Sequence, residues 1–582
     1  MCPDPVARTT FHGPTAFLKL STTRQRERGR MRISAERQQS KAGLFSITQL
    51  FPLLENEWFV LLLLLIWALF VCYWQLSSPV ESDEALYAAV GRRIARTREW
   101  IQLEHEGNPF FYKPPLHFWL MALSIFFWGE NEFAVRFPSA TFGIATILLV
   151  YYCGKLLFHR RVGLIGSLVT STTFVAVWLA RKGKIDVELG FWMNLAFFVF
   201  TLAYRKEQRR GGFLWLSFLC MAIATMLKGP IGILLPGFGA VTYLAFVRRS
   251  KMFREIPFLV VCSAIFFCVT AIYYWSLGAD FNRYFFVVEN LMRLTEESKP
   301  FLFYFYMIFP DLFPWSFFLP CVGFYLWNSR PSGFSDEERL AGLWLISFLL
   351  FLSIPSYKEE DFLVYLIPPF ALIIARYWDR FLILGFSNLP PAENRLLRAT
   401  LILLSLGILA GLWVGPPLVQ MRFPKFPQFL PPFYIFLLFV GSVAVMYAAW
   451  RQQTRMFFLS VAAVAVIMTF GVVQFFDPAR GQYNSVKMIG QQLRSVVGES
   501  ALVISPTNGT VELLYYLDRF DPVRYVGSAE EASSIFRSEQ KTFGLLTGDL
   551  YEKLKHRDDL SLYRLADYSH RRWHYVLVSN RK

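Results

Sequence analysis

The sequence predicts a mainly α-helical, polytopic membrane protein that carries a small α/β domain at its C-terminal end. Three observations support this fold class. The 582 residues are 54% hydrophobic and 18% aromatic, which is more than a soluble domain needs to fill its core. The apolar residues form long runs that are separated by short basic breaks. From residue 477 onward the apolar density drops, and short alternating segments replace the long runs.

The N-terminal part is predicted to be a basic cytoplasmic tail followed by a membrane anchor. Residues 1–57 are rich in Arg and Lys and hold few long apolar runs. Trp58–Leu76 is apolar over a length that crosses a bilayer, and it is expected to remain as an anchor. The net charge of +16 is explained by topology and by contact of basic residues with anionic membrane lipids. Nucleic acid is therefore not an expected partner.

The positive-inside rule orients the apolar runs that follow the anchor. At roughly 20 residues per crossing, residues 58–476 are predicted to cross the membrane about 13 times. This odd number places the C-terminal domain, residues 477–582, outside the cytoplasm. Leu116–Trp128 is too short to cross and is predicted to be an interfacial or re-entrant helix. The basic turns that fix the cytoplasmic side include 159–161, 205–210 and 248–251.

The C-terminal domain is predicted to be a small periplasmic α/β unit. Ala501–Ile504 and Tyr575–Val578 have the composition of strands, whereas Val486–Val497 and Glu530–Arg537 have helical periodicity.

Ionisable residues gather in the predicted outer loop 77–136, although charge beside lipid is costly. Asp83 and Glu84 open an amphipathic helix after the first span. Asp83 could serve as a base, a metal ligand or a helix cap, because an acid at a helix start suits all three roles. Further along, Lys113 precedes two prolines that stiffen the turn. Its ammonium suits a phosphate at headgroup level, and it equally suits an ordinary snorkelling lysine.

More charged residues fall on the same predicted side of the membrane. Asp186 lies at an outer span end among lysines, where it is either part of an ion pair or a second catalytic carboxylate. Lys228 and Lys358 add cations on this face. Residues 278–300 are predicted to be an outer loop that acts as a lid or as a plain connector.

The order of these motifs carries a resemblance to a known family. The matching residues are Asp83-Glu84, Tyr87-Ala88, Trp100-Ile101, Phe111-Tyr112-Lys113-Pro114, Phe133-Ala134-Val135-Arg136, Asp186 and Lys228-Gly229. In this order they resemble the polyprenyl-phosphate-sugar-dependent transferases of the GT-C fold. That superfamily includes the bacterial aminoarabinose transferases that act on lipid A and the protein O-mannosyltransferases.

The resemblance implies a hexosyl- or pentosyltransferase of the inner membrane with a periplasmic active site and C-terminus. Its donor would be a polyprenyl-phosphate-linked sugar, and its acceptor lipid A, lipopolysaccharide or another envelope glycan. A carboxylate would orient or deprotonate the acceptor, and cations would hold the departing phosphate. The catalytic candidates are Asp83, Glu84 and Asp186. The candidates for binding the lipid phosphate are Lys113, Arg93, Lys228 and Lys358.

Departures from the family pattern leave metal use and acceptor choice open. Leu86 stands where the aminoarabinose transferases often have a basic residue, and Tyr112 where an acid can precede the lysine. Glu104 and His105 are candidate ligands for a divalent metal, but neighbouring loop residues more often face different ways, so no cofactor is firmly predicted.

Three alternatives to an envelope glycan transferase are an enzyme that resembles the protein O-mannosyltransferases, a non-enzymatic transporter of lipid or sugar, and an envelope-assembly scaffold. A transporter would carry central charges inside its spans and repeated halves, whereas the ionisable residues here cluster at one face and no internal repeat is seen.

Overall fold

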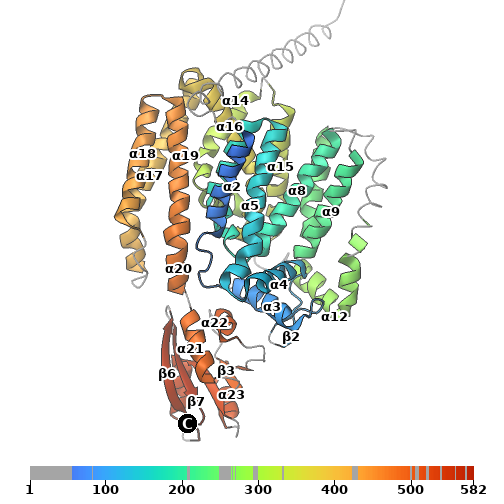
Figure 1. Cartoon of the computed structure of the whole chain (residues 1–582), viewed down its shortest axis with the longest axis vertical. Coiled ribbons are helices and arrows are strands. Elements are labelled where there is room, and N and C mark those ends of the chain that lie inside the picture. Colours follow the sequence, from blue (N-terminus) through green and yellow to red (C-terminus); the bar gives the residue numbers. More distant parts are fainter. Residues whose placement is uncertain are drawn as a thin grey trace, which may run out of the picture.

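The computed structural model describes most of residues 56–581 and shows a large helical bundle joined to a smaller α/β unit (Figure 1). The predicted basic tail lies outside the described residues, apart from its last two positions. The gaps within the described range are 82, 106, 206–209, 248–263, 265–266, 269, 293–298, 331–332, 423–429, 485, 498–500, 505–509, 519–523, 538–540, 558 and 571–572.

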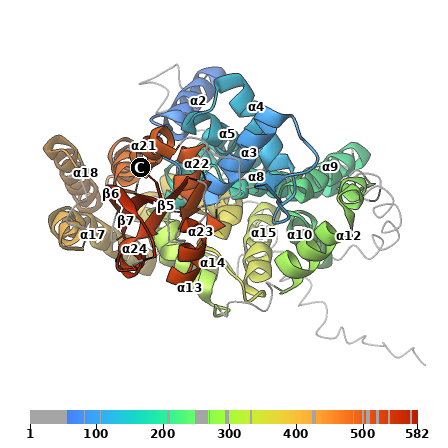
Figure 2. The same ribbon diagram turned by 90° about the horizontal axis from the view of Figure 1, so that it is seen from below.

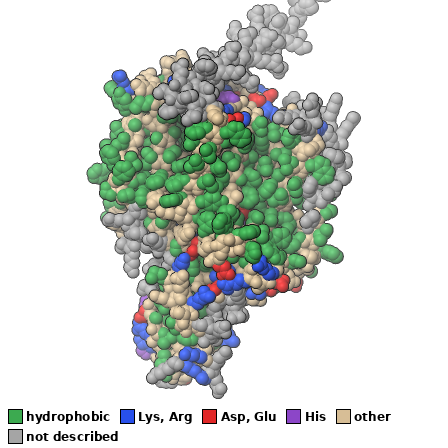
Figure 3. Space-filling view, in the orientation of Figure 1, with side chains coloured by type: hydrophobic (Ala, Val, Ile, Leu, Met, Phe, Trp, Pro, Cys, Tyr) green, Lys and Arg blue, Asp and Glu red, His purple; other side chains and the backbone are tan. Residues whose placement is uncertain are grey.

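The bundle confirms the predicted fold class, a mainly α-helical polytopic membrane protein. Among the described residues, seven helices are long and apolar enough to cross a membrane, or nine if each of two bent pairs counts as one crossing. Large apolar side chains such as Trp413 and Phe433 face outward, and hydrophobic side chains cover most of the bundle in Figure 3. The expected count of about 13 crossings stays a prediction, because several stretches lie outside the described chain.

Polar caps and close glycine contacts define the bundle helices. Asn56 and Asn131 cap two of them, and Ser335 forms a capping box with Glu338 at the start of a third. A Cβ on Gly154 would lie 2.6 Å from the Cα of Gly163, so glycine at this position allows the backbones of these two neighbouring helices to approach each other closely. The helices are α2 (Glu57–Tyr73), α5 (Glu132–Leu157), α6 (Arg160–Thr172), α7 (Phe174–Ala180), α8 (Ile185–Arg205), α9 (Arg210–Lys228), α10 (Ile231–Val247), α13 (Phe303–Asp311), η6 (Trp315–Phe318), α14 (Leu319–Ser329), α15 (Asp336–Ser353), η7 (Glu360–Leu366), α16 (Ile367–Asn388), α17 (Pro391–Arg422), α18 (Pro432–Trp450) and α19 (Thr454–Gly471).

Two helices lie across one end of the bundle, next to the α/β unit (Figure 1). They are α3 (Asp83–Thr97) and α4 (Leu116–Trp128), which pack against each other. The first begins at the Asp83-Glu84 pair, and the second occupies the segment that was too short to cross a membrane. A small hairpin of β1 (Glu104–His105) and β2 (Asn108–Pro109) joins them.

The segment predicted as an outer loop at 278–300 contains helices over 278–291, and its position outside the membrane stays a prediction. It forms α12 (Gly278–Asn282) and the π-helix η4 (Arg283–Leu291). Apolar Phe281 and Phe285 are buried and stack on one another, which gives the segment a packed face that its charged residues obscure in the sequence. Positions 293–298 of the predicted lid segment lie outside the described residues.

The C-terminal unit contains a mixed five-stranded sheet in the order β4-β3-β5-β7-β6. The strands β4, β3 and β5 are parallel, and β5, β7 and β6 are antiparallel. The proposed boundary at residue 477 falls at the start of a helix that continues the last bundle helix through a π-helical turn. The elements are η8 (Val472–Phe476), α20 (Asp477–Asn484), α21 (Lys487–Val497), β3 (Ala501–Ile504), α22 (Thr510–Leu517), β4 (Arg524–Tyr525), α23 (Ala529–Phe536), β5 (Thr542–Thr547), α24 (Gly548–Lys555), β6 (Tyr563–His570) and β7 (Trp573–Ser579).

Candidate active site

The start of α3 is held in place by a buried ion pair between Glu84 and Arg136. The two carboxylate oxygens of Glu84 accept from Arg136 Nε at 2.6 Å and Nη2 at 2.8 Å. The backbone N–H of Gly183 donates to Glu84 Oε1 at 2.7 Å. Burial raises the pKa of the Glu84 carboxyl, but the charge and hydrogen bonds of Arg136 outweigh burial and hold this pKa below its usual value. The Glu84 carboxylate is thus occupied by the protein itself.

The preceding residue, Asp83, has the opposite environment. Its side chain is 63% exposed, and its Oδ2 lies 3.7 Å from Lys184 Nζ. Lys184 also lies 2.6 Å from Asp361 Oδ2. Burial lowers the pKa of Lys184, but the carboxylate of Asp361 outweighs burial and raises it, so the ammonium stays charged. Of the two acids that open α3, only Asp83 offers an open carboxylate to a substrate.

Asp186 forms a compact buried cluster with Lys228 and Tyr365. Lys228 Nζ lies 2.6 Å from Asp186 Oδ1, and the hydroxyl of Tyr365 donates to the same oxygen. Lys228 also sits 4.3 Å from the centre of the Phe362 ring, a cation–π contact. Asp186 is therefore part of an ion pair, and its partner Lys228 comes from a different helix.

Glu359 borders the Asp186 cluster and belongs to the site, although the sequence did not single it out. Its carboxylate accepts a hydrogen bond from the hydroxyl of Tyr357, and its backbone carbonyl accepts from Tyr304 at 3.1 Å. Burial raises the pKa of this carboxyl above its usual value. The charged run Lys358-Glu359-Glu360-Asp361 is the sequence feature that could have pointed to Glu359 and Asp361.

Lys113 is paired with an acid that the sequence did not identify, Glu289 of η4. Its Nζ lies 3.0 Å from Glu289 Oε2 and donates to the carbonyl of Tyr112 at 3.1 Å. The Tyr112 ring meets Tyr284 of η4 edge to face at 5.4 Å. The same helix reaches the Asp186 cluster, because a Cβ on Gly229, next to Lys228, would lie 2.6 Å from the ring of Phe285. The helix η4 therefore borders both Lys113 and Lys228.

The two other predicted phosphate ligands lie in protein-occupied positions. Arg93 forms a salt bridge with Glu104 of the β1–β2 hairpin. Lys358 is buried, and its ammonium donates to the backbone carbonyls of Lys299, at 3.1 Å, and of Pro355. Neither contact brings these cations to Asp83.

The metal candidates do not assemble a metal site in the described part of the chain. The carboxylate of Glu104 forms a salt bridge with Arg93. His105 is the next residue of the same two-residue strand, where successive side chains point to opposite faces. Nowhere in the described chain do three His, Cys, Asp or Glu side chains gather in a way that could hold a metal ion.

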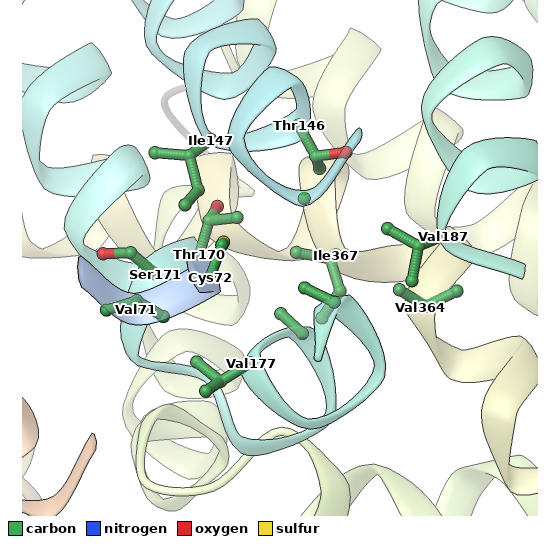
Figure 4. A pocket seen from close by; sticks show the side chains of 13 residues that line it. Val71, Cys72, Thr146, Ile147, Thr170, Ser171, Val177, Val187, Val364 and Ile367 are labelled. Carbon is green, nitrogen blue, oxygen red and sulfur yellow. The ribbon is translucent and has the colours of Figure 1, made fainter. Parts of the chain in front are cut away.

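A small internal cavity lies within the helical bundle (Figure 4). It measures about 20 Å³ and is lined mainly by apolar side chains, including Val71, Cys72, Ile147 and Val177. That space holds about one water molecule and is far too small for a sugar.

Comparisons with known proteins agree with this architecture. The family model described as dolichyl-phosphate-mannose-protein mannosyltransferase matches residues 112–275. The undecaprenyl phosphate-alpha-4-amino-4-deoxy-L-arabinose arabinosyl transferase of Pseudomonas aeruginosa (strain LESB58) is 26% identical over 458 residues, which are 76% of this chain and 80% of that protein. The enzyme of the same name from Pectobacterium carotovorum subsp. carotovorum (strain PC1) is 28% identical over 328 residues, 54% of this chain and 57% of the relative.

A solved structure extends the agreement to three dimensions. The crystal structure of ArnT from Cupriavidus metallidurans bound to undecaprenyl phosphate superposes with a TM-score of 0.73 at 21% identity. The match covers 89% of this chain and 98% of that one. The relatives and the shared fold together confirm the resemblance expected from the sequence: the chain is a multi-pass membrane protein that resembles the glycosyltransferases of the GT-C fold.

Proposed function

We propose that the protein transfers a sugar from a polyprenyl-phosphate donor to an envelope acceptor at the outer face of the inner membrane. The observation that carries this proposal is the open carboxylate of Asp83 at the start of α3, on the same side of the bundle as the buried pair of Asp186 and Lys228. The donor class is supported by the names of the relatives, which are undecaprenyl phosphate-aminoarabinose transferases, and by the lipid bound in the superposed structure.

The reaction needs one base and one cation at opposite sides of the sugar. Asp83 accepts the proton of the acceptor hydroxyl while that oxygen attacks the anomeric carbon. The bond from the anomeric carbon to the phosphate oxygen breaks, and its electron pair leaves with the polyprenyl phosphate. Lys113 stabilises the charge that grows on this phosphate. Such a single displacement inverts the anomeric configuration.

The remaining candidate residues support these two groups. Glu84 fixes the start of α3, and Asp186 holds Lys228 beside η4. Lys113 is the preferred phosphate ligand, because it pairs with Glu289 of η4, the helix that also borders Lys228. Arg93 and Lys358 are secondary candidates: Arg93 pairs with Glu104 of the β1–β2 hairpin, and the ammonium of Lys358 is buried against two backbone carbonyls.

Lipid A is the proposed acceptor, because the relatives that cover most of the chain are aminoarabinose transferases. A protein hydroxyl is the second candidate, favoured by the description of the family model that matches residues 112–275.

Mass spectrometry of envelope glycans tests the proposal. Lipid A and other glycans are compared between cells that lack the protein and cells complemented with wild type, Asp83→Asn or Asp336→Asn at matched membrane levels. Asp336 is the control, because it is also an exposed acid that opens a helix beside a basic residue. A sugar-sized mass that is present with wild type and Asp336→Asn, and absent with Asp83→Asn, supports the transferase. Equal profiles with all three proteins contradict it.

A further inference from the structure

One aspartate of the C-terminal domain, Asp518, gathers three arginines at the junction with the bundle. Its carboxylate lies 3.0 Å from Arg92 Nη1, 2.9 Å from Arg96 Nη2 and 2.8 Å from Arg494 Nη2. Arg92 and Arg96 belong to α3, whereas Arg494 belongs to α21. The side chains of Asp518 and Arg92 are each only 7% exposed, so this pair is shielded from solvent. Charge pairs of this kind are screened far less than surface pairs.

Two tyrosines of α22, Tyr515 and Tyr516, add further contacts to this junction. The guanidinium of Arg92 lies 4.4 Å from the centre of the Tyr515 ring. The hydroxyl of Tyr516 accepts from the backbone N–H of Val80 at 2.8 Å and donates to Glu132 at 3.2 Å. These contacts tie the C-terminal domain to the segment before α3 and to the start of α5.

An apolar core continues across the same junction. Ala85 and Ala88 of α3 share one buried cluster with Leu514 of α22 and with Leu577 of the sheet. Seen from below, α22 lies beside α3 (Figure 2). Charged side chains gather where the bundle meets the C-terminal unit in Figure 3. The domain is therefore packed onto α3 by both apolar and charged contacts.

We propose that Asp518 is a positioning residue for the transfer reaction: the C-terminal domain uses it to hold α3, and with it Asp83, in the reactive place. This inference rests on the proposed function, in which Asp83 acts as the base. Glu84 anchors the beginning of α3 to the bundle, and Asp518 anchors its later turns to the outer domain. A helix held at two points keeps Asp83 fixed, and a displacement of about 1 Å can cost roughly 100-fold in rate.

Kinetics of the purified full-length protein test the positioning role. Asp518 has a backbone φ of 58°, a left-handed conformation that Asn tolerates well, so Asp518→Asn removes the charge without adding backbone strain. We expect kcat to fall at least about tenfold, while the KM for the polyprenyl-phosphate donor changes less than about twofold. The KM is spared because Lys113 lies outside the junction. Asp518→Glu should recover part of the rate.

Asp567→Asn serves as the control, because Asp567 is an exposed, arginine-paired aspartate of the same domain. Unchanged kcat in Asp518→Asn, or an equal loss in Asp567→Asn, would overturn the proposal. Hydrogen exchange of the α3 amides gives a readout that needs no reaction: faster exchange in Asp518→Asn supports the contact, and unchanged exchange refutes it. If Asp83→Asn keeps full activity, the proposed base is wrong, while hydrogen exchange still decides whether Asp518 holds α3.

Discussion

Removal of the Glu84 carboxylate is expected to loosen the start of α3, because it leaves the buried Arg136 without its counter-charge. Both side chains are almost completely buried, and the hydrogen bonds that Arg136 keeps in the described chain once the carboxylate is gone go to uncharged acceptors, among them the carbonyls of Leu76 and Pro79. Breaking one partner of a buried pair costs about 3–5 kcal/mol. At about 1.4 kcal/mol per factor of ten, the lower figure corresponds to a change of roughly 100-fold in the opening equilibrium.

Hydrogen exchange provides the assay, because the N–H of Gly183 donates directly to Glu84 and reports on its loss. In Glu84→Ala, the amides of Gly183 and of α3 beyond its first turn, whose N–H groups are bonded within the helix, should exchange roughly 100-fold faster than in wild type. Glu57→Ala is the control: this acid forms a half-exposed pair with Lys155, and its loss should cost no more than about 1 kcal/mol. If the Gly183 amide keeps its wild-type protection in Glu84→Ala, the Glu84 carboxylate does not hold the start of α3 in place.

Four further outcomes are expected. Because the folded-state pKa of Glu84 lies below its usual value of 4.5, its stabilisation is present above that value and lost as the pH falls through the folded pKa; acid should therefore lower the protection factors of the α3 amides, taken relative to intrinsic exchange at each pH, in wild type and less so in Glu84→Gln. Lys113→Gln should raise the KM for the donor about tenfold or more with correct folding retained, and Lys299→Gln, a cation whose ammonium donates to the backbone carbonyl of Lys358, should not. Gly229→Ala should impair activity and thermal stability, because φ is 83° and the new Cβ would meet Phe285, whereas Gly237→Ala meets no neighbour and should be neutral or stabilising. Tyr365→Phe should lower thermal stability by about 1 kcal/mol, measured by melting in detergent, through the lost hydrogen bond to Asp186, and an unchanged melting temperature would contradict that role.

Much of the fold could be predicted from the sequence, because apolar runs and turn chemistry are local signals. The helix that begins at Asp83, the short α4 and the strand at Ala501–Ile504 all follow from spacing and composition. The helical nature of 278–291 could not be predicted, since its apolar face becomes visible only through packing of Phe281 and Phe285 with each other. Pattern alone could not show that a π-helix would form there.

The candidate site was predictable in its residue types and only partly in its pairings. Asp83, Asp186 and Lys228 stood out as charges at span ends, and the structure brings the last two into contact. Their partners could not be identified, because Tyr365 lies 179 positions from Asp186 and Glu289 lies 176 positions from Lys113. Such long-range pairs depend on tertiary packing, which periodicity does not encode.

The role of Asp83 as the base in transfer from a polyprenyl phosphate can be tested in vitro by comparing the phosphate released with the sugar transferred. Purified wild type, Asp83→Asn and Asp336→Asn are incubated with a polyprenyl-phosphate sugar and lipid A, and released polyprenyl phosphate and transferred sugar are counted together. In wild type and Asp336→Asn we expect one phosphate to be released per sugar transferred, with an inverted anomeric centre. In Asp83→Asn the rate should be at least about 100-fold lower. Equal rates in all three proteins, or retention of the anomeric configuration, would contradict this role.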